Sequence, residues 1–333
     1  MDASHPVALR PDEHFGQPRP IAPDSDTLRS RPIAPDSDTL RSRAIAPDSD
    51  TLRSRPVAPD SDTLHLGIRA VVFDWAGTVV DFGSRAPAMT FVETFSAQGV
   101  PVTEAEARAP MGLPKRDHIR TMGMMARVAE AWREIHRSAF DESAVDRLYE
   151  AFTPRQVMAV RAHADVISGV VSVVDALRRR GIRIGSTTGY PRIVMAAITD
   201  LVASQGFVPD AMVCADDLPV TRPTPLGMWR CLIELGVWPA WSAVKVDDTV
   251  PGLREGRDAG AWTVGILASG NAAGLTHSEW DALDDRGRQE VRDRSSAALA
   301  GARPDFTIDT VADLLPVIDQ IGHRLWCGER PGG

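Results

Sequence analysis

A short apolar run near residue 70 places the strongest limit on what this chain can fold into. Residues 68–73 are apolar except for Arg69, as expected of a strand buried in a parallel sheet. The run ends at Asp74, and Gly77 and Thr78 follow as a tight turn. Ligands bind at the carboxyl ends of such strands, where an aspartate can be a nucleophile, a metal ligand or both. By itself the pattern also fits a strand-end turn capped by an aspartate.

Strand and helix patterns alternate along the chain after about residue 165. Several predicted helices end at a glycine, as at Gly181, Gly236 and Gly260. Strands that alternate with helices indicate an α/β fold with a doubly wound, Rossmann-like parallel sheet. The later strands are expected at 182–187, 211–214, 243–246, 262–267 and 305–308, and the helices at 170–180, 193–204, 226–235, 253–259 and 311–321.

The segment between residues 84 and 164 contains no strand pattern. Its apolar spacing predicts helices near 87–98, 104–108, 126–137 and 142–161, with a further helix that begins near Pro114 and a kink near Pro154. We therefore expect an all-helical cap domain inserted after the first strand. The resulting division is a tail at 1–67, a core domain at 68–83 and 165–325, a cap at 84–164 and a C-terminal tail at 326–333.

The first 67 residues form a separate stretch. From Arg19 they contain four copies of a twelve-residue unit, which reads RPIAPDSDTLRS in the first two copies. Each copy is polar and has little apolar surface to offset the entropy of ordering, so we expect disorder. The repeats can be an array that binds partners or a duplication without function, and the natural start codon can lie further downstream.

The overall composition is that of an ordinary soluble globular protein. The net charge is −8 and 43% of the residues are hydrophobic, which does not suggest a nucleic-acid-binding surface. We find neither a membrane-spanning apolar stretch nor a signal peptide. Cys214, Cys231 and Cys327 have no metal-like spacing and form no disulfide framework. We expect a cytoplasmic protein that binds neither nucleic acid nor membrane.

Lysine is used at only two positions. The chain has 37 lysines and arginines together, and only Lys115 and Lys245 are lysines. Arginine stays protonated in proteins, whereas lysine can lose its proton and act as an amine nucleophile. Either lysine can also have been retained by chance, without a functional need for an amine. Lys245 lies inside a predicted buried strand and faces away from Asp248 by simple alternation, so we expect a structural role for it.

Polar clusters follow four of the predicted strands. Asp74 belongs to the first, and the hydroxyl-rich turn at 186–190 is the second and suits an anion at a helix N-terminus. The third contains Arg222, and the fourth is the carboxylate pair Asp247 and Asp248, which suits Mg²⁺. In this order the clusters resemble the four motifs of the haloacid dehalogenase superfamily of phosphotransferases, over about residues 68–325.

This resemblance implies a nucleophile and a metal site. Asp74 would attack phosphorus, and Mg²⁺ would bind Asp74, the backbone carbonyl of Ala76 and Asp248. Gly252 stands where some members of the superfamily carry a further aspartate that supports the metal. Asp247 is expected to take over that supporting role, although which of the two neighbouring carboxylates touches the metal stays open.

Longer matches indicate the branch of the superfamily that cleaves carbon–phosphorus bonds. Superfamily phosphatases usually have a second aspartate two residues after the nucleophile, which protonates the departing ester oxygen. Ala76 stands at that position, so an ester hydrolase would lose a contribution of about 10²–10⁴ in rate. The matching stretches are FDWAGT at 73–78, MGLPKRDHIR at 111–120, GSTTGY at 185–190, RPTP at 222–225, KVDDT at 245–249 and AGAWTVG at 259–265.

Cleavage of a carbon–phosphorus bond needs an electron sink, and a protonated imine on Lys115 can supply it. Lys115 lies near the start of a predicted helix, where the helix dipole should lower its pKa. His118 is three residues further, on the same helix face, and could move protons as the imine forms and hydrolyses. Alternatively, these two residues are a surface charge and an ordinary helix-face histidine. The resemblance implies substrate contacts from Thr188, Gly189, Tyr190, Arg222, Met111, Gly112 and Ser84.

The resemblance therefore implies a Mg²⁺-dependent hydrolase of a small aldehyde phosphonate, and a homodimer as in other members of this type. Because Lys115 is on the cap and Asp74 on the core, the chemistry should require cap closure. A phosphate-ester phosphatase or phosphomutase of the same superfamily, without an imine, is one alternative. A non-catalytic interaction protein that uses the repeat tail is another.

Overall fold

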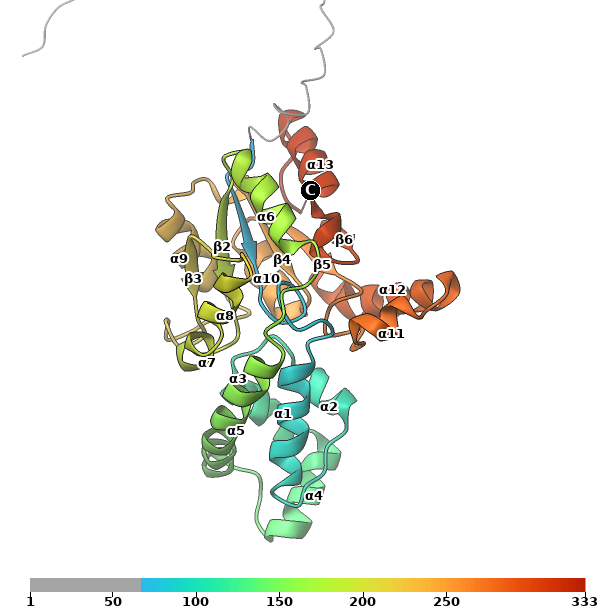
Figure 1. The fold of residues 1–333 in the computed structure, drawn as a ribbon. Helices are drawn as coiled ribbons and strands as arrows, with labels where there is room; N and C mark the ends of the chain where they lie inside the picture. Colours follow the sequence, from blue (N-terminus) through green and yellow to red (C-terminus); the bar gives the residue numbers. More distant parts are fainter. Residues whose placement is uncertain (1–66, 333) are drawn as a thin grey trace, which may run out of the picture. The chain divides into compact units, whose positions relative to one another are not determined.

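The computed structural model describes residues 67–332. Within that range, six strands form one parallel sheet in the order β3-β2-β1-β4-β5-β6 (Figure 1). Strand β1 lies between β2 and β4, at the point where the strand order reverses, and open α/β sheets bind ligands there. The strands are β1 Ala70–Phe73, β2 Arg183–Thr187, β3 Ala211–Val213, β4 Ala243–Asp247, β5 Trp262–Ile266 and β6 Phe306–Ile308.

Helices cover both faces of the sheet because β1 is apolar on both sides. Val71 and Phe73 belong to a buried cluster that includes residues of α6 and α13, whereas Ala70 and Val72 pack with residues of α9 on the other face. The predicted doubly wound α/β core is confirmed. Its helices are α6 Val170–Arg179, α7 Arg192–Ala196, α8 Thr199–Ser204, α9 Leu226–Leu235, α10 Val250–Asp258, α11 His277–Asp281, α12 Asp285–Leu299 and α13 Leu314–Trp326.

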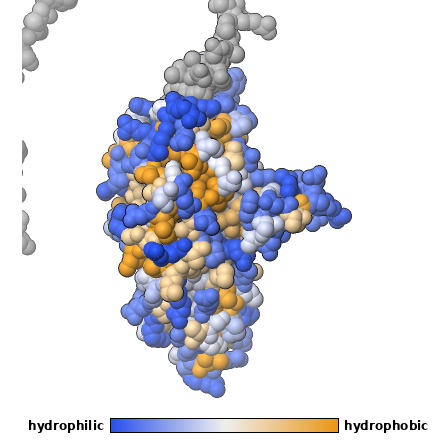
Figure 2. Space-filling view, viewed as in Figure 1, coloured by the Kyte–Doolittle hydropathy of each residue, from blue (hydrophilic) through white to orange (hydrophobic). Residues whose placement is uncertain are grey.

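Two parts of this core differ from the sequence prediction. The single helix expected at 193–204 is two short helices, α7 and α8, that are separated at residues 197–198. Helices α11 and α12 were not predicted, because α12 buries only Val291, Ser295 and Leu299 and so has almost no apolar period. Figure 2 shows that the lobe formed by α11 and α12 has a largely hydrophilic surface.

The segment after β1 is entirely helical and has a buried apolar cluster of its own. Phe91 and Phe95 from α1 pack there with Ile119 from α3, Trp132 from α4 and Phe152 from α5. In Figure 1 these helices lie together beyond the end of β1. They are α1 Arg85–Ser96, α2 Glu104–Arg108, α3 Lys115–Gly123, α4 Ala126–His136 and α5 Glu142–Ala162, and α5 runs through Pro154.

The predicted repeat tail, residues 1–67, lies outside the described residues apart from Gly67. At the other end, α13 extends to Trp326 and residues 327–332 follow it. Among residues 67–332, no helix combines the length and the apolar character needed to cross a bilayer.

Candidate active site

A small pocket lies where the carboxyl ends of β1 and β2 meet the helical segment. The space open to the centre of a water molecule is about 20 Å³, which is room for roughly one water. All the predicted site residues line it except His118, Asp247 and Asp248, and Pro87 and Thr249 line it in addition. The lining is Asp74, Ala76, Ser84, Pro87, Met111, Gly112, Lys115, Thr188, Gly189, Tyr190, Arg222 and Thr249.

Asp74 follows the last residue of β1 and is buried. Its Oδ1 lies 2.8 Å from a terminal nitrogen of Arg222. Burial and the neighbouring charge of Asp247 raise the pKa of Asp74 to about 6, against the opposing effect of Arg222. Asp74 is therefore mostly ionised at neutral pH, with one oxygen held by Arg222 and the other available for attack.

Lys115 is the first residue of α3, and its side chain is buried rather than on the surface. Its Nζ lies 5.0 Å from the centre of the Tyr190 ring, on the core, and 5.6 Å from that of Phe91, on α1. Burial is the main cause that lowers the pKa of Lys115 to about 8. The predicted direction of the shift agrees, but desolvation rather than the helix dipole is its principal cause.

His118 lies on the buried face of α3, and its ring stacks on Phe91 with the ring centres 3.7 Å apart. Its Nε2 lies 2.8 Å from the carbonyl oxygen of Ala107, which can only accept a hydrogen bond, so Nε2 carries the proton. Nδ1 is buried and has no partner among the described residues. Burial, and then the charge of Lys115, hold the pKa of His118 well below its usual range. His118 is thus a neutral ring with a free proton acceptor.

Three carboxylates gather beside the pocket, and only one of them lacks a cation. Asp74, Asp247 and Asp248 each place an oxygen within 4.8 Å of the others. Asp247 Oδ2 lies 3.2 Å from both Arg222 and Lys245. Asp248 Oδ1 is buried without a hydrogen bond to any residue in 67–332.

Burial and the charges of its two neighbours raise the pKa of Asp248, so a cation there would relieve an unfavourable charge. Carboxylate oxygens are the ligands that hard divalent cations prefer. The residues therefore fit a metal ion, with Asp74 and Asp248 as the candidate ligands and Asp247 behind them.

Two glycines make room for these carboxylates. A Cβ added at Gly77, where φ is +79°, would lie 2.3 Å from Asp248 Oδ2. A Cβ added at Gly252 would lie 2.0 Å from Asp247 Oδ2. The glycine at 252 and the aspartate at 247 are thus sterically linked, because the carboxylate of one fills the space that a side chain on the other would need.

A buried hydrogen-bonded network beneath Asp74 contains residues that the sequence analysis missed. Lys245 Nζ donates to Thr187 Oγ1 at 2.6 Å, and this hydroxyl lies 2.6 Å from Glu255 Oε2. Arg222 Nε donates to the same Glu255 oxygen at 3.1 Å. Lys245 is thus fully buried in β4, where a structural role is expected for it, and Arg222 contacts Asp74 itself. The only sequence signal for Glu255 is a charged residue on the apolar face of a helix.

The loop before α3 lies directly against the core at the pocket. Gly112 has φ +93°, and a Cβ there would lie 2.4 Å from Thr249 Oγ1. A Cβ on Gly189 would lie 3.3 Å from the carbonyl oxygens of Gly112 and Leu113. This close approach brings Met111 and Lys115 into the same pocket as Asp74.

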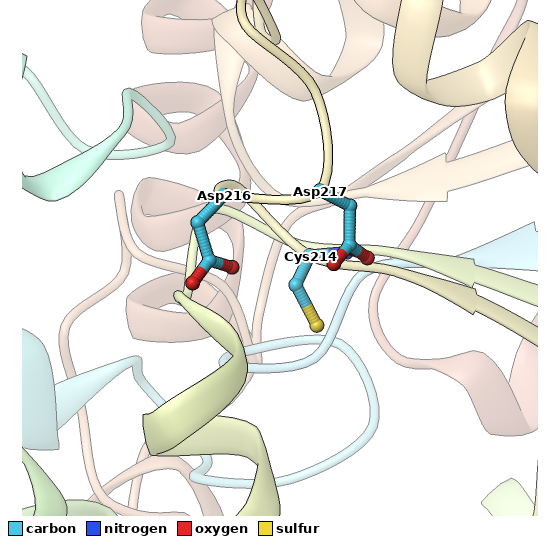
Figure 3. A group of neighbouring side chains, drawn as sticks. All are labelled: Cys214, Asp216 and Asp217. Carbon is cyan, nitrogen blue, oxygen red and sulfur yellow. The ribbon is translucent and has the colours of Figure 1, made fainter.

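A second group of possible metal ligands lies on the loop after β3 and consists of Cys214, Asp216 and Asp217 (Figure 3). Arg192 already occupies its carboxylates: its backbone N–H donates to Asp216 at 2.7 Å and its Nε to Asp217 at 2.8 Å. Burial raises the pKa of the Cys214 thiol to about 12, so it is a poor ligand at neutral pH. This group is a loop-stabilising arrangement.

Known proteins resemble the chain in sequence and in fold. The family model of the haloacid dehalogenase-like hydrolases matches residues 68–260. A phosphonoacetaldehyde hydrolase of Paraburkholderia xenovorans is 47% identical, over 79% of this chain and 99% of that protein. The one of Vibrio cholerae O395 is 48% identical, over 79% of this chain and 98% of that protein.

A solved structure supports the same relationship. The phosphonoacetaldehyde hydrolase-like protein from Oleispira antarctica superimposes with a TM-score of 0.78 at 41% identity, covering 80% of this chain and 96% of that one. The resemblance expected from the four strand-end motifs is confirmed. The chain belongs to the haloacid dehalogenase-like hydrolases and, within them, to the phosphonoacetaldehyde hydrolase family.

Proposed function

We propose that this protein hydrolyses the carbon–phosphorus bond of phosphonoacetaldehyde and releases acetaldehyde and phosphate. One observation carries the proposal beyond the family relationship. A buried lysine with a lowered pKa, Lys115, shares a pocket with the carboxylate of Asp74. Ala76 stands in the same pocket, where an ester hydrolase would need an acid. The pocket thus combines a phosphorus-attacking carboxylate with an amine that can form an imine.

The first step is imine formation. The neutral amine of Lys115 adds to the aldehyde carbon, water leaves, and the protonated imine remains on Lys115. The unpartnered Nδ1 of His118 can accept a proton from the adding amine and return it to the departing oxygen. The buried surroundings of Phe91 and Tyr190 keep bulk water away from the imine.

The second step cleaves the carbon–phosphorus bond. A carboxylate oxygen of Asp74 attacks phosphorus, and the electron pair of the breaking bond moves into the iminium to give an enamine. Arg222 orients Asp74, and Thr188, Gly189 and Arg222 lie where they can hold the phosphonate oxygens.

Mg²⁺ bound by Asp74, the carbonyl oxygen of Ala76 and Asp248, with Asp247 in support, would neutralise charge on the phosphoryl group. The acidic cluster beside the pocket supports this choice of cofactor. Asp248 is preferred over Asp247 as the ligand because Asp247 already faces two cationic side chains.

The last steps restore the enzyme. Protonation of the enamine carbon and addition of water to the imine release acetaldehyde and the amine of Lys115. A second water attacks the phosphorus of the aspartyl phosphate and releases phosphate from Asp74. Met111, Gly112, Tyr190 and Ser84 would line the part of the pocket around the carbon chain.

We also propose the domain division and the assembly that the family relationship suggests. Residues 84–164 act as a cap on a core made of 68–83 and 165–325. The buried cluster that most of the helical segment forms by itself supports this division, while Ala86, Val160 and Ala164 near its two ends pack with the core cluster. The enzyme would act as a cytoplasmic homodimer, and size-exclusion chromatography with light scattering tests the assembly.

Borohydride trapping tests the proposed reaction. Incubation with phosphonoacetaldehyde and borohydride should reduce the imine and leave a stable adduct on Lys115, detectable by peptide mass spectrometry. Lys245 is fully buried in β4 and should stay unmodified, so it serves as an internal control. Turnover of ordinary sugar phosphates without any Lys115 adduct would instead support a phosphate-ester phosphatase.

A further inference from the structure

The guanidinium of Arg108, at the end of α2, joins the helical segment to the core. Its NH1 group donates to the carbonyl oxygens of Gly83 at 2.8 Å and of Asn271 at 3.1 Å, and to Asn271 Oδ1 at 3.1 Å. Its Nε and NH2 groups donate to Glu104 on α2 at 2.9 and 2.7 Å. One side chain, 13% exposed, thus bonds to α2 on one side and to two core loops on the other.

Asn271 completes the contact and extends it to the proposed metal ligand. Its Nδ2 donates back to the carbonyl oxygen of Arg108 at 3.2 Å, so the two residues are bonded in both directions. Its backbone N–H donates to Asp248 Oδ2 at 2.7 Å. The residue that holds Arg108 therefore also fixes the orientation of Asp248.

The pocket leaves little room for a substrate in this state. Only 4% of the Lys115 surface is exposed, and Tyr190 of the core lies over its ammonium group. The pocket has room for about one water, so a substrate can enter only when the helical segment moves away from the core. The chain must therefore alternate between an open state and the closed state described here.

We propose that Arg108 and Asn271 form a latch that stabilises the closed state and ties closure to the orientation of Asp248. They are positioning residues that touch neither Lys115 nor Asp74. The catalytic value of closure rests on the proposed function, because only closure brings the imine-forming amine to the phosphorus-attacking carboxylate. The closed-state contact itself is independent of any substrate.

Acylation of lysine measures the latch directly. The chain contains only two lysines, Lys115 and Lys245. A small amine-acylating reagent should modify Lys115 only when the closed state opens, and Lys245 only when the core unfolds. Peptide mass spectrometry over time then gives an opening rate and an unfolding rate from the same sample of the full chain without substrate.

The variants Arg108→Gln and Asn271→Ala should open the pocket. Loss of hydrogen bonds to a charged group should raise the rate of Lys115 acylation by about tenfold or more, with Lys245 still unmodified. The double variant should react about as fast as Arg108→Gln alone, because both changes break the same contact. Asn271→Ala keeps the backbone N–H and provides a second test if Arg108→Gln folds poorly.

Arg127→Gln is the matched control. Arg127 pairs with Glu106 of α2 and accordingly stabilises only the helical segment. In the Arg127→Gln variant, Lys115 should be acylated at the same rate as in the wild type. Wild-type rates in both latch variants, or an equal acceleration in Arg127→Gln, would overturn the latch. Failure of the wild type to hydrolyse phosphonoacetaldehyde would overturn the proposed function and leave the acylation result standing.

Discussion

Single residues in the pocket owe their chemistry to burial. The same desolvation that lowers the pKa of Lys115 raises that of Asp74, so the amine and the carboxylate approach each other in proton affinity. His118 loses its charge for the same reason and keeps a free acceptor nitrogen. Burial thus leaves Asp74 mostly ionised and His118 neutral, and it makes the neutral amine of Lys115 far more accessible at neutral pH than in an exposed lysine.

Replacement of Lys115 by arginine separates charge from nucleophilicity. Lys115→Arg keeps the cation but cannot form an imine, so phosphate release from phosphonoacetaldehyde should fall by about 10³-fold or more. A coupled phosphate assay with the purified variant measures this, and an unchanged melting temperature shows that the fold survives. A fully active arginine variant would rule out the imine mechanism.

The rate of imine formation should depend on pH through Lys115. With a pKa of about 8, roughly a tenth of Lys115 is neutral at pH 7, so imine formation should rise with pH and level off above about 8. Asp74 and Asp248 act to raise this pKa and Arg222 to lower it. Because this pKa is lower than in the unfolded chain, Lys115 also makes the fold more stable as pH rises from about 8 to 10.5.

Imine formation timed from pH 6 to 9, with aliquots quenched into excess borohydride at one fixed alkaline pH, tests this dependence through the amount of reduced Lys115 adduct. Asp74 and His118 titrate below that rise and Tyr190 well above it, whereas burial also raises the pKa of Asp248. The same series on Asp248→Asn therefore separates the limb of the amine from that of this carboxyl. A rate that stays constant across this range would contradict the assignment.

At the scale of the elements, β4 and α10 pack closely against each other where Gly252 of α10 faces the carboxylate of Asp247. Gly252→Ala places a methyl group against the carboxylate of Asp247, which should cost about 1–3 kcal/mol in the free energy of unfolding. Asp247→Gly in the same chain should remove the clash and so make the alanine less costly than it is alone. Denaturant unfolding of both single variants and the double variant measures this coupling. Equal costs of Gly252→Ala in both backgrounds would show that the two positions are independent.

The elements also show how far the sequence could predict the fold. Strands β1 and β4 are largely apolar runs that end at an aspartate, so their places follow from pattern alone. Helix α12 has a polar surface and a sparse buried face, which leaves no period to detect. The same pattern reasoning found the pocket residues on strand ends, because parallel strands bring their carboxyl ends to one edge.

Contacts between distant segments could not be predicted in this way. Glu255 reaches Arg222 and Thr187, and Arg108 reaches Asn271, across separations that carry no local signal. The position of Lys115 at a helix start predicts that its pKa is lowered. The burial that is the main cause depends on Tyr190 and Phe91, which are not neighbours of Lys115 in sequence.

For the whole molecule, the two parts of the reaction should respond differently to metal removal. In the proposed reaction, imine formation uses Lys115 and His118, whereas carbon–phosphorus cleavage depends on the charge around Asp74 and Asp248. Chelation with EDTA should therefore abolish phosphate release and leave borohydride trapping at Lys115 intact. Addition of Mg²⁺ should restore phosphate release. Loss of trapping under chelation would show that the metal site also governs substrate binding.

The separate buried clusters of the helical segment and the sheet domain have a consequence for how such enzymes change. In the proposed reaction the sheet domain supplies the nucleophile Asp74 and the helical segment supplies the amine of Lys115, and most of the helical segment packs on a buried cluster of its own. Substitutions in the buried cluster of α1 to α5 can therefore alter which carbon group is accepted with little effect on Asp74 or Asp248. Selection can therefore act largely separately on the residues that bind the carbon group and on those that bind phosphorus, and contacts such as that of Gly112 with Thr249 and that of Arg108 with Asn271 link the two.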